Sequence, residues 1–147
     1  MLKVRLAKLS DLDAVFAVEK ACFKDAYSKE LLLALMILHH DSFFVAELDG
    51  GVVGYAVGAL MRGRGHVISL AVHPSCRRRG LGRALMKALE DALAAKGAAE
   101  LELEVREDNV EASALYDKLG FKKVGRISRY YSDGSDALLY RKSLDER

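Results

Sequence analysis

The feature that most constrains this chain is the basic turn Arg77-Arg78-Arg79-Gly80-Leu81-Gly82, which joins an apolar run to a helical pattern. The apolar run, residues 66–73, is typical of a buried strand, and the only proline, Pro74, follows it. Glycines allow a backbone path that brings several N–H groups to one point, and the dipole of the following helix adds partial positive charge there. Arginines can bind phosphate oxygens with two N–H groups. The sequence therefore predicts a phosphorylated ligand at the start of a central helix.

Hydrophobic periodicity predicts the remaining elements. Period-two alternation indicates strands, and apolar residues three or four apart indicate helices. Ser10 is expected to cap the first helix, Asp49-Gly50-Gly51 to form a hairpin turn, and Gly97 to end the central helix. Further strands are expected at residues 2–8, 42–48, 52–61, 100–106, 121–127 and 136–144, and helices at 28–40, 81–96 and 109–120. The resulting order, β-α-α-β-β-β-α-β-α-β-β, predicts a mixed α/β (α+β) fold.

Composition limits the class of protein. A length of 147 residues with 51% apolar content fits one domain, residues 1–147, with a substantial core. The net charge of +2 is small, and only Arg62 and Arg64 extend the basic cluster, so we expect no nucleic-acid partner. The two cysteines are far apart and have no metal-ligand spacing, which favours a reducing, cytoplasmic context without a metal. No segment has the length of a membrane span, and we expect a monomer or weak homodimer.

Two motifs together resemble the GNAT superfamily of acetyl-CoA-dependent N-acetyltransferases. The first is the Arg-x-x-Gly-x-Gly pattern that begins at Arg77 after a strand. The second is the segment Asn109-Val-Glu-Ala-Ser-Ala-Leu-Tyr116-Asp-Lys-Leu-Gly120-Phe121, similar to the family's Asn-x-x-Ala-x-x-Leu-Tyr-x-x-x-Gly-Phe signature. The element order is similar across nearly the whole chain. The resemblance implies a central sheet of about seven strands, splayed at the coenzyme A site and flanked by four helices.

The resemblance also implies the residues of the coenzyme A site. The backbone N–H groups of residues 78–82, with Arg77 and Arg83 beside them, would hold the pyrophosphate. The pantetheine arm would pair like an added strand with the edge of the preceding strand, where Leu70 and Val72 supply N–H donors. The positions expected to bind along that edge are Leu70, Ala71 and Val72. A solvated basic turn and an ordinary buried strand are the plainer interpretations of these segments.

The resemblance assigns chemical roles to three further side chains. Asn109 would contact the pantetheine, and Tyr116 would protonate the departing thiolate; an N-cap and a core aromatic are the alternatives. The sequence Leu103-Glu104-Val105-Arg106 resembles the RimI-type branch, the ribosomal-protein alanine N-acetyltransferases, in which the glutamate is the general base. We carry that role to Glu104, although a glutamate on the polar side of a strand is most often only solvated.

The acceptor site is implied by two loops. The segment Tyr130-Tyr131-Ser132-Asp133-Gly134-Ser135-Asp136-Ala137 resembles the loop that covers the peptide in protein N-terminal acetyltransferases, although a tight turn alone also explains it. Where bacterial RimI-type enzymes carry Pro-Trp-Ser, this chain has Asp25-Ala26-Tyr27-Ser28, a departure that leaves the preferred first residue of the acceptor open. The residues expected to bind the acceptor are Phe23, Asp25, Tyr27 and Tyr131, with Asp25 as a second acid/base candidate.

The expected activity is direct acetyl transfer from acetyl-CoA to a primary amine in a ternary complex. An α-amine has a pKa of about 7.7–8.0 and lysine about 10.4, a gap of roughly 2.5 units or about 3.4 kcal/mol. A single carboxylate acting through water is a modest base, so the acceptor is expected to be a protein N-terminus. The alternatives are a small-molecule amine or a protein lysine and, in another class, a non-catalytic acyl-CoA sensor.

Overall fold

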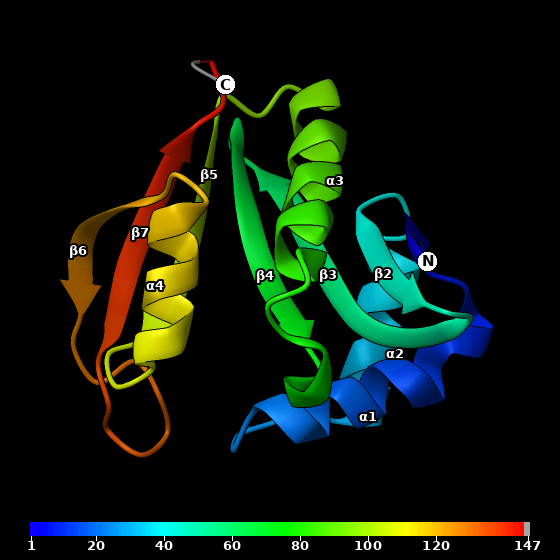
Figure 1. Cartoon of the computed structure of the whole chain (residues 1–147). Coiled ribbons are helices and arrows are strands. Elements are labelled where there is room, and N and C mark those ends of the chain that lie inside the picture. Colours follow the sequence, from blue (N-terminus) through cyan, green and yellow to red (C-terminus); the bar gives the residue numbers. More distant parts are fainter. Residues whose placement is uncertain (146–147) are drawn as a thin grey trace.

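The computed structural model describes residues 1–145 and places their strands in one seven-stranded sheet. The order across the sheet is β1-β2-β3-β4-β5-β7-β6, and the helices cover both faces (Figure 1). The strands are β1 (Leu2–Leu6), β2 (Phe43–Leu48), β3 (Gly51–Met61), β4 (Arg64–Val72), β5 (Glu100–Arg106), β6 (Lys122–Ile127) and β7 (Ala137–Ser143). The element order predicted from periodicity is confirmed.

Two pairs of helices pack on opposite faces of the sheet. These helices are α1 (Leu12–Cys22), α2 (Lys29–Leu38), α3 (Leu81–Ala95) and α4 (Val110–Lys118). Because side chains alternate along a strand, Tyr55 and Ala71 pack in the apolar cluster beneath α1 and α2, whereas Ala56 and Leu70 pack in the cluster beneath α3 and α4. The sheet is thus the shared wall of two cores.

The caps explain where the helices begin, with one correction to the sequence prediction. Ser28 caps α2, accepting a hydrogen bond from the Leu31 N–H at 3.1 Å. Ser10 does not cap α1 as expected, because it lies within a 3-10 turn, Leu9–Asp11, and Asp11 occupies the N-cap position. The Asp11 carboxylate instead accepts from the Lys8 N–H at 2.7 Å and pairs with Arg5 at 2.8 Å. Both serine and aspartate are common at helix starts. We attribute the N-cap position of Asp11 to its ion pair with Arg5.

The sheet opens between β4 and β5. Among the described strands these two form the parallel pair, and their register contains only two residue pairs, Gly65 with Leu101 and His66 with Glu102. Beyond that point they diverge toward their C-terminal ends (Figure 1). β4 stays paired with β3 up to Val72, and β5 stays paired with β7 along its length. The sheet therefore has two halves that separate where β4 leads into the basic turn.

Candidate active site

The basic turn begins α3 with a backbone that favours convergent N–H groups. After β4 the chain makes a 3-10 turn at Pro74–Cys76 and then passes through two left-handed residues, Arg78 with φ of 65° and Gly80 with φ of 80°. Gly80 is also the N-cap residue of α3. Left-handed residues within such a turn direct successive N–H groups toward one point, and the first N–H groups of a helix lack intrahelical partners. The turn therefore has the backbone that an anion requires.

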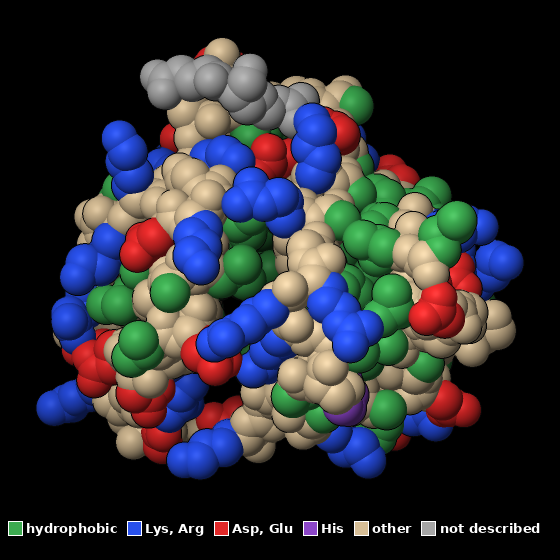
Figure 2. Space-filling view, in the orientation of Figure 1, with side chains coloured by type: hydrophobic (Ala, Val, Ile, Leu, Met, Phe, Trp, Pro, Cys, Tyr) green, Lys and Arg blue, Asp and Glu red, His purple; other side chains and the backbone are tan. Residues whose placement is uncertain are grey.

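Figure 2 shows basic side chains gathered around a hollow between α4 and the segment that precedes α3. Arg77 lies in the gap between the two halves of the sheet. Its Nη1 pairs with Glu111 of α4 at 2.8 Å, and its Nε donates to the Val72 carbonyl at 3.2 Å. A longer contact of 3.7 Å joins Nη2 to the Cys22 sulfur. Arg77 thus connects both halves of the molecule, whereas sequence reasoning treated it only as a phosphate ligand.

The edge of β4 that faces the gap carries backbone donors. The His73 N–H donates to the Val53 carbonyl of β3 at 2.8 Å. Because N–H groups along a strand alternate between its two edges, those of Leu70 and Val72 point away from β3 and into the gap. The same alternation directs the backbone of Ala71 toward its partner Tyr55 in β3. Of the three predicted binding positions on β4, Leu70 and Val72 have the orientation that pairing with an added strand requires.

Asn109 and Tyr116 lie on α4, across the gap from β4. The Asn109 side chain accepts a hydrogen bond from the Ala112 N–H at 3.1 Å, so it caps the helix. Tyr116 is 8% exposed, and its ring packs against those of Phe121 and Tyr140, with centroids 5.7 and 6.4 Å away. Burial raises the pKa of the Tyr116 phenol, which keeps the hydroxyl protonated at neutral pH. A general acid must carry its proton in this way.

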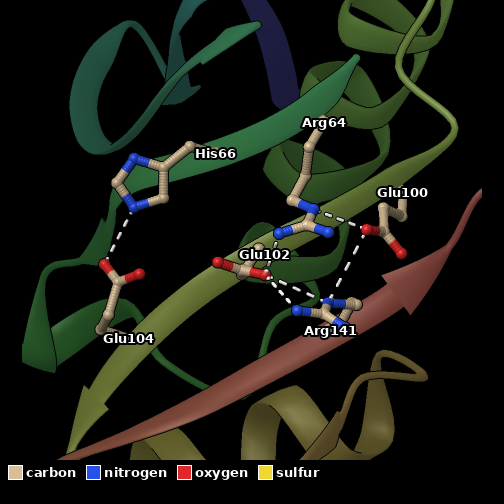
Figure 3. A network of polar contacts seen from close by, with 6 residues as sticks. All are labelled: Arg64, His66, Glu100, Glu102, Glu104 and Arg141. Atoms are coloured by element: carbon tan, nitrogen blue, oxygen red, sulfur yellow. Dashed lines mark hydrogen bonds and ion pairs between the residues drawn. The ribbon is translucent and has the colours of Figure 1, made fainter. Parts of the chain in front are cut away.

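Glu104 meets a partner that the sequence did not indicate. Its Oε1 lies 2.9 Å from Nε2 of His66, and 3.4 Å from the hydroxyl of Tyr130. Figure 3 shows the two side chains turned toward each other from β5 and β4. The hydrogen bond to Glu104 raises the pKa of His66 above its ordinary value. The carboxylate and the imidazole therefore hold a proton between them at the point where the strands begin to separate.

His66 is a residue that sequence analysis missed as a site residue. Its neighbours in the sequence form no motif that indicates such a role. The pairing of His66 with Glu102 places it beside the polar side of β5, two residues from Glu104. Only the parallel pairing of β4 with β5 brings His66 to Glu104. A single sequence does not specify which distant strands pair.

A groove of about 600 Å³ leads from this pair along the polar side of β4 and β5. An ion-pair network forms part of its wall (Figure 3): Arg64 contacts Glu100 at 2.5 Å and Glu102 at 3.1 Å, while Arg141 contacts Glu102 at 2.8 Å. The groove is lined by Met61, Arg62, Arg64, His66, Glu102 and Glu104. The network links β4, β5 and β7 near the closed end of the gap.

Aromatic side chains from the two predicted acceptor loops gather around Glu104. The rings of Tyr130 and Tyr131 lie 5.0 Å apart. Burial, followed by the neighbouring Tyr130, raises the pKa of Tyr131 to about 12. The pKa of Tyr27 is also raised, first by burial and then by the charges of Glu19 and Glu104. Two of the predicted acceptor residues, Tyr27 and Tyr131, therefore lie within electrostatic reach of the candidate base.

The other two predicted acceptor residues have different surroundings. Phe23 packs against the apolar cluster beneath α1 and α2. Asp25 is exposed, and its carboxylate forms an ion pair with Arg106 at 3.4 Å. The contacts of Phe23 are those of a core residue, and its role in binding the acceptor stays a prediction. Asp25 has a cationic partner, Arg106, that the sequence did not indicate.

A buried glutamate fixes the loop that carries Tyr27. Glu19 in α1 is 2% exposed, and it accepts a hydrogen bond from the Tyr27 N–H at 2.9 Å. Its other oxygen accepts from the Tyr55 hydroxyl, which also contacts Ser69 at 2.9 Å. Burial raises the pKa of Glu19. These bonds hold the start of α2 against β3 and β4, and so position Tyr27 beside the site.

Residues 1–145 contain neither a metal-ligand cluster nor a helix suited to a membrane. No group of three or more His, Cys, Asp or Glu side chains there is arranged to hold a metal ion. Within the same residues, no helix combines the length and apolar character that crossing a membrane requires.

The chain belongs to the acetyltransferase (GNAT) family, whose model matches residues 12–121. That span begins at α1 and ends after α4, so it includes the basic turn, the gap and the signature that contains Tyr116. The family and the acetyltransferase class predicted from the two motifs are confirmed.

Named relatives refine this assignment. The "Uncharacterized N-acetyltransferase MJ1530" of Methanocaldococcus jannaschii is 41% identical, over 92% of this chain and 88% of its own length. The N-alpha-acetyltransferase of Sulfurisphaera tokodaii is 37% identical, over 93% of this chain and 90% of its own. The crystal structure of the ribosomal-protein-S18-alanine N-acetyltransferase from Escherichia coli matches with a TM-score of 0.83 and 28% identity, over 98% of this chain and 94% of its own. The predicted RimI-like resemblance and fold are confirmed.

Proposed function

We propose that this chain transfers the acetyl group of acetyl-CoA to the α-amine of a protein N-terminus, by direct attack within a ternary complex. The observation that carries the proposal is the placement of Glu104 and His66 where β4 and β5 separate. A thioester lying in the gap would have the Glu104 carboxylate and the His66 imidazole on one side and the buried phenol of Tyr116 on the other. The kinship with an N-alpha-acetyltransferase and a ribosomal-protein alanine N-acetyltransferase supports the same acceptor.

The coenzyme would bind through the backbone at both ends of the gap. The N–H groups of residues 78–82 would hold the pyrophosphate, with Arg83 beside them. Leu70 and Val72 would pair with the pantetheine arm, as an added strand pairs with a sheet edge. Because Arg77 and Glu111 span the gap, their ion pair would need to open or shift when the arm enters. Asn109 would meet the arm from α4 only if its capping bond were exchanged.

The transfer itself would need two proton movements. The attacking amine must lose a proton, and Glu104, hydrogen-bonded to His66, would take it directly or through water. An N–H of β4 would stabilise the negative charge that develops on the thioester oxygen. The departing thiolate needs a proton, and Tyr116, whose raised pKa keeps it protonated, would supply it. Holding both substrates in one gap makes the attack effectively intramolecular.

The acceptor loops favour a peptide over a small amine. Tyr27 and Tyr131 bring half-buried aromatic surface beside Glu104, and the groove of about 600 Å³ continues outward from it. A chain of several residues can contact both surfaces at once. The lower pKa of an α-amine also suits a single carboxylate base better than a lysine does.

The test is a steady-state screen of acetyl transfer over short peptides that differ in their first residue. The controls are an N-terminally blocked peptide with an internal lysine, and spermidine. We expect transfer to free N-termini with a preference among first residues, and little or none to the controls. Equal or faster transfer to the blocked peptide or to spermidine would favour the lysine or small-amine alternative. Binding of acetyl-CoA without transfer to any amine would favour a sensor.

A further inference from the structure

Arg106 lies between the two loops that would enclose an acceptor. It is the last residue of β5, and its side chain is 19% exposed. The loops are residues 23–28, between α1 and α2, and residues 128–136, between β6 and β7; we call them the acceptor loops. Nη1 of Arg106 pairs with Asp25 of the first loop at 3.4 Å. Nη2 contacts Asp133 of the second loop and donates to Ser135 Oγ at 3.0 Å.

The second acceptor loop is folded so that it presents these groups to Arg106. The Tyr131 N–H donates to the Ser135 carbonyl at 3.1 Å, and the Gly134 N–H to the Tyr131 carbonyl at 2.9 Å. The Ser135 N–H donates to Asp133 Oδ1 at 3.0 Å, which aims the other carboxylate oxygen at Arg106. The guanidinium also lies 4.8 Å from the centroid of the Tyr131 ring, within the range of a cation–π contact. The Arg106 side chain thus contacts two polar side chains of this turn and the ring of Tyr131.

The charges around Arg106 do not cancel. One guanidinium faces three carboxylates, those of Asp25, Asp133 and Asp108, the last at 3.4 Å from Nε. The hydrogen bond from Arg106 holds the pKa of Asp133 well below its usual range. Removing the guanidinium would leave like charges on two loops that it now holds together, so the loops would separate rather than relax in place.

We propose that Arg106 is a positioning residue that sets the spacing of the two acceptor loops, and thereby the affinity for the acceptor and the tolerance for charge near its N-terminus. The proposal rests on the proposed function, because it assigns the acceptor to the space between these loops. A planar, forked cation suits this role, since its N–H groups point in fixed and divergent directions. Neither reacting atom needs to touch it.

The plainer alternative is that Arg106 only stabilises the end of β5. Arg126 supplies the matched control. It contacts the same second loop through Asp136 at 3.1 Å, and it also pairs with Glu107, the residue that follows β5. The Arg129 N–H donates to the same Asp136 at 3.0 Å. Its described partners lie on β5's end and the second loop, with none on residues 23–28. A loss of local stability would affect Arg126→Met as much as Arg106→Met.

The experiment compares the wild-type protein with Arg106→Met, Arg106→Lys and Arg126→Met. Hydrogen exchange measured by mass spectrometry should rise in both acceptor loops of Arg106→Met, but only in residues 128–136 of Arg126→Met. With a peptide that the wild-type protein acetylates, the KM for peptide should rise roughly tenfold in Arg106→Met, because small displacements of positioning groups are costly. The KM for acetyl-CoA should stay within about twofold. Arg106→Lys should recover part of the loss.

A second readout uses the uncompensated carboxylates. In Arg106→Met, the ratio of kcat/KM for a peptide with lysine at its second position to one with glutamate should rise severalfold. The proposal is overturned if exchange in residues 23–28 is unchanged, or if both KM values and the charge ratio in Arg106→Met match those in Arg126→Met. A wild-type protein that acetylates no peptide contradicts the proposed function and the acceptor part of this inference, while the exchange data still decide whether Arg106 joins the loops.

Discussion

Glu102 and Glu104 lie on the same face of β5 but have different hydrogen-bond partners. Glu102 accepts hydrogen bonds from Arg64 and Arg141, whereas Glu104 faces a histidine and a tyrosine hydroxyl. A carboxylate held by two guanidinium groups is a poor base because accepting a proton would break both charge-assisted pairs. At the scale of single residues, this contrast supports the proposal that Glu104, and not Glu102, is the base.

Glu104→Gln should lower kcat by about 10²–10⁴, the usual contribution of a general base, while acetyl-CoA affinity stays within about twofold. Steady-state kinetics measures kcat, and calorimetry measures the affinity for acetyl-CoA. Glu102→Gln is the matched control, because it makes the same chemical change two residues away and should keep kcat. A wild-type kcat in Glu104→Gln would remove this residue from the mechanism.

The pH dependence of kcat should report His66. Its raised pKa means that the His66–Glu104 pair keeps a proton to a higher pH than a free imidazole would, and a protonated pair cannot accept the proton of the amine. In the wild-type protein, kcat should therefore fall on the acid side with a midpoint above the ordinary value of about 6.5. In His66→Gln the titrating imidazole is gone, so that midpoint should move to lower pH. An identical acid limb in both proteins would show that His66 does not titrate in the rate.

The sequence pointed to Glu104 as the proposed base but gave no sign of the contacts that His66 and Arg106 make, for a physical reason. Glu104 stands in a local pattern, Leu103-Glu104-Val105-Arg106, that carries its own signal. His66 gains its role only when β4 pairs with β5, and Arg106 gains its role only when two loops distant in sequence fold beside it. Contacts of this kind depend on topology, which a period-two pattern does not contain.

At the scale of elements, α3 and the turn before it are the parts that sequence patterns predicted best. The two glycines were expected to shape the backbone, and Gly80 does so with a left-handed φ of 80°. Gly82 has no such strain, and a Cβ there would make only an ordinary contact with Leu115, at 3.6 Å. The fold therefore does not require glycine at position 82, and we propose that the ligand does.

Gly82→Glu should weaken acetyl-CoA binding roughly 100-fold, the equivalent of about 3 kcal/mol of lost charge-assisted hydrogen bonds and added repulsion. The fold should survive, since an acidic residue in the first turn of a helix is favourable. Calorimetry measures the affinity, and thermal unfolding checks the fold. Lys87→Gln, with the same change in net charge later in α3, should bind normally. Undiminished binding in a folded Gly82→Glu protein would contradict the placement of the pyrophosphate.

Gly58 lies where β3 packs closely against β4, and substituting it tests how tightly these strands must pack to support the gap. A Cβ on Gly58 would lie 2.8 Å from the His66 carbonyl oxygen and 3.0 Å from the Leu93 side chain. Since the nearer atom is backbone, Gly58→Ala should destabilise the protein by about 1–3 kcal/mol in chemical denaturation. Gly51→Ala at the start of the same strand meets its nearest atom only at 3.9 Å, and it should change stability by less than about 0.5 kcal/mol. Equal effects would show that the junction can adapt.

At the scale of the whole molecule, the sheet must meet two opposing structural requirements. Its strands must pair to build two cores, yet the proposed function requires β4 and β5 to stay apart so that a ligand can pair with β4. The chain meets both needs by joining the halves at one end, where Gly65 allows Leu101 to pack closely and where Arg64 links Glu100 and Glu102. The sequence predicted the elements and their order, but the separation of β4 from β5 came from resemblance, because strand periodicity is the same whether or not a neighbour is paired.

The most direct test of the central claim, that both substrates bind side by side in this gap, is calorimetry with a bisubstrate compound. In this compound, coenzyme A is joined through an acetyl bridge to the α-nitrogen of a peptide that the protein acetylates. The account predicts that it binds at least about 100-fold more tightly than coenzyme A alone, because one molecule fills both halves of the site. Affinity no greater than that of coenzyme A, or no measurable heat with either compound, would contradict it.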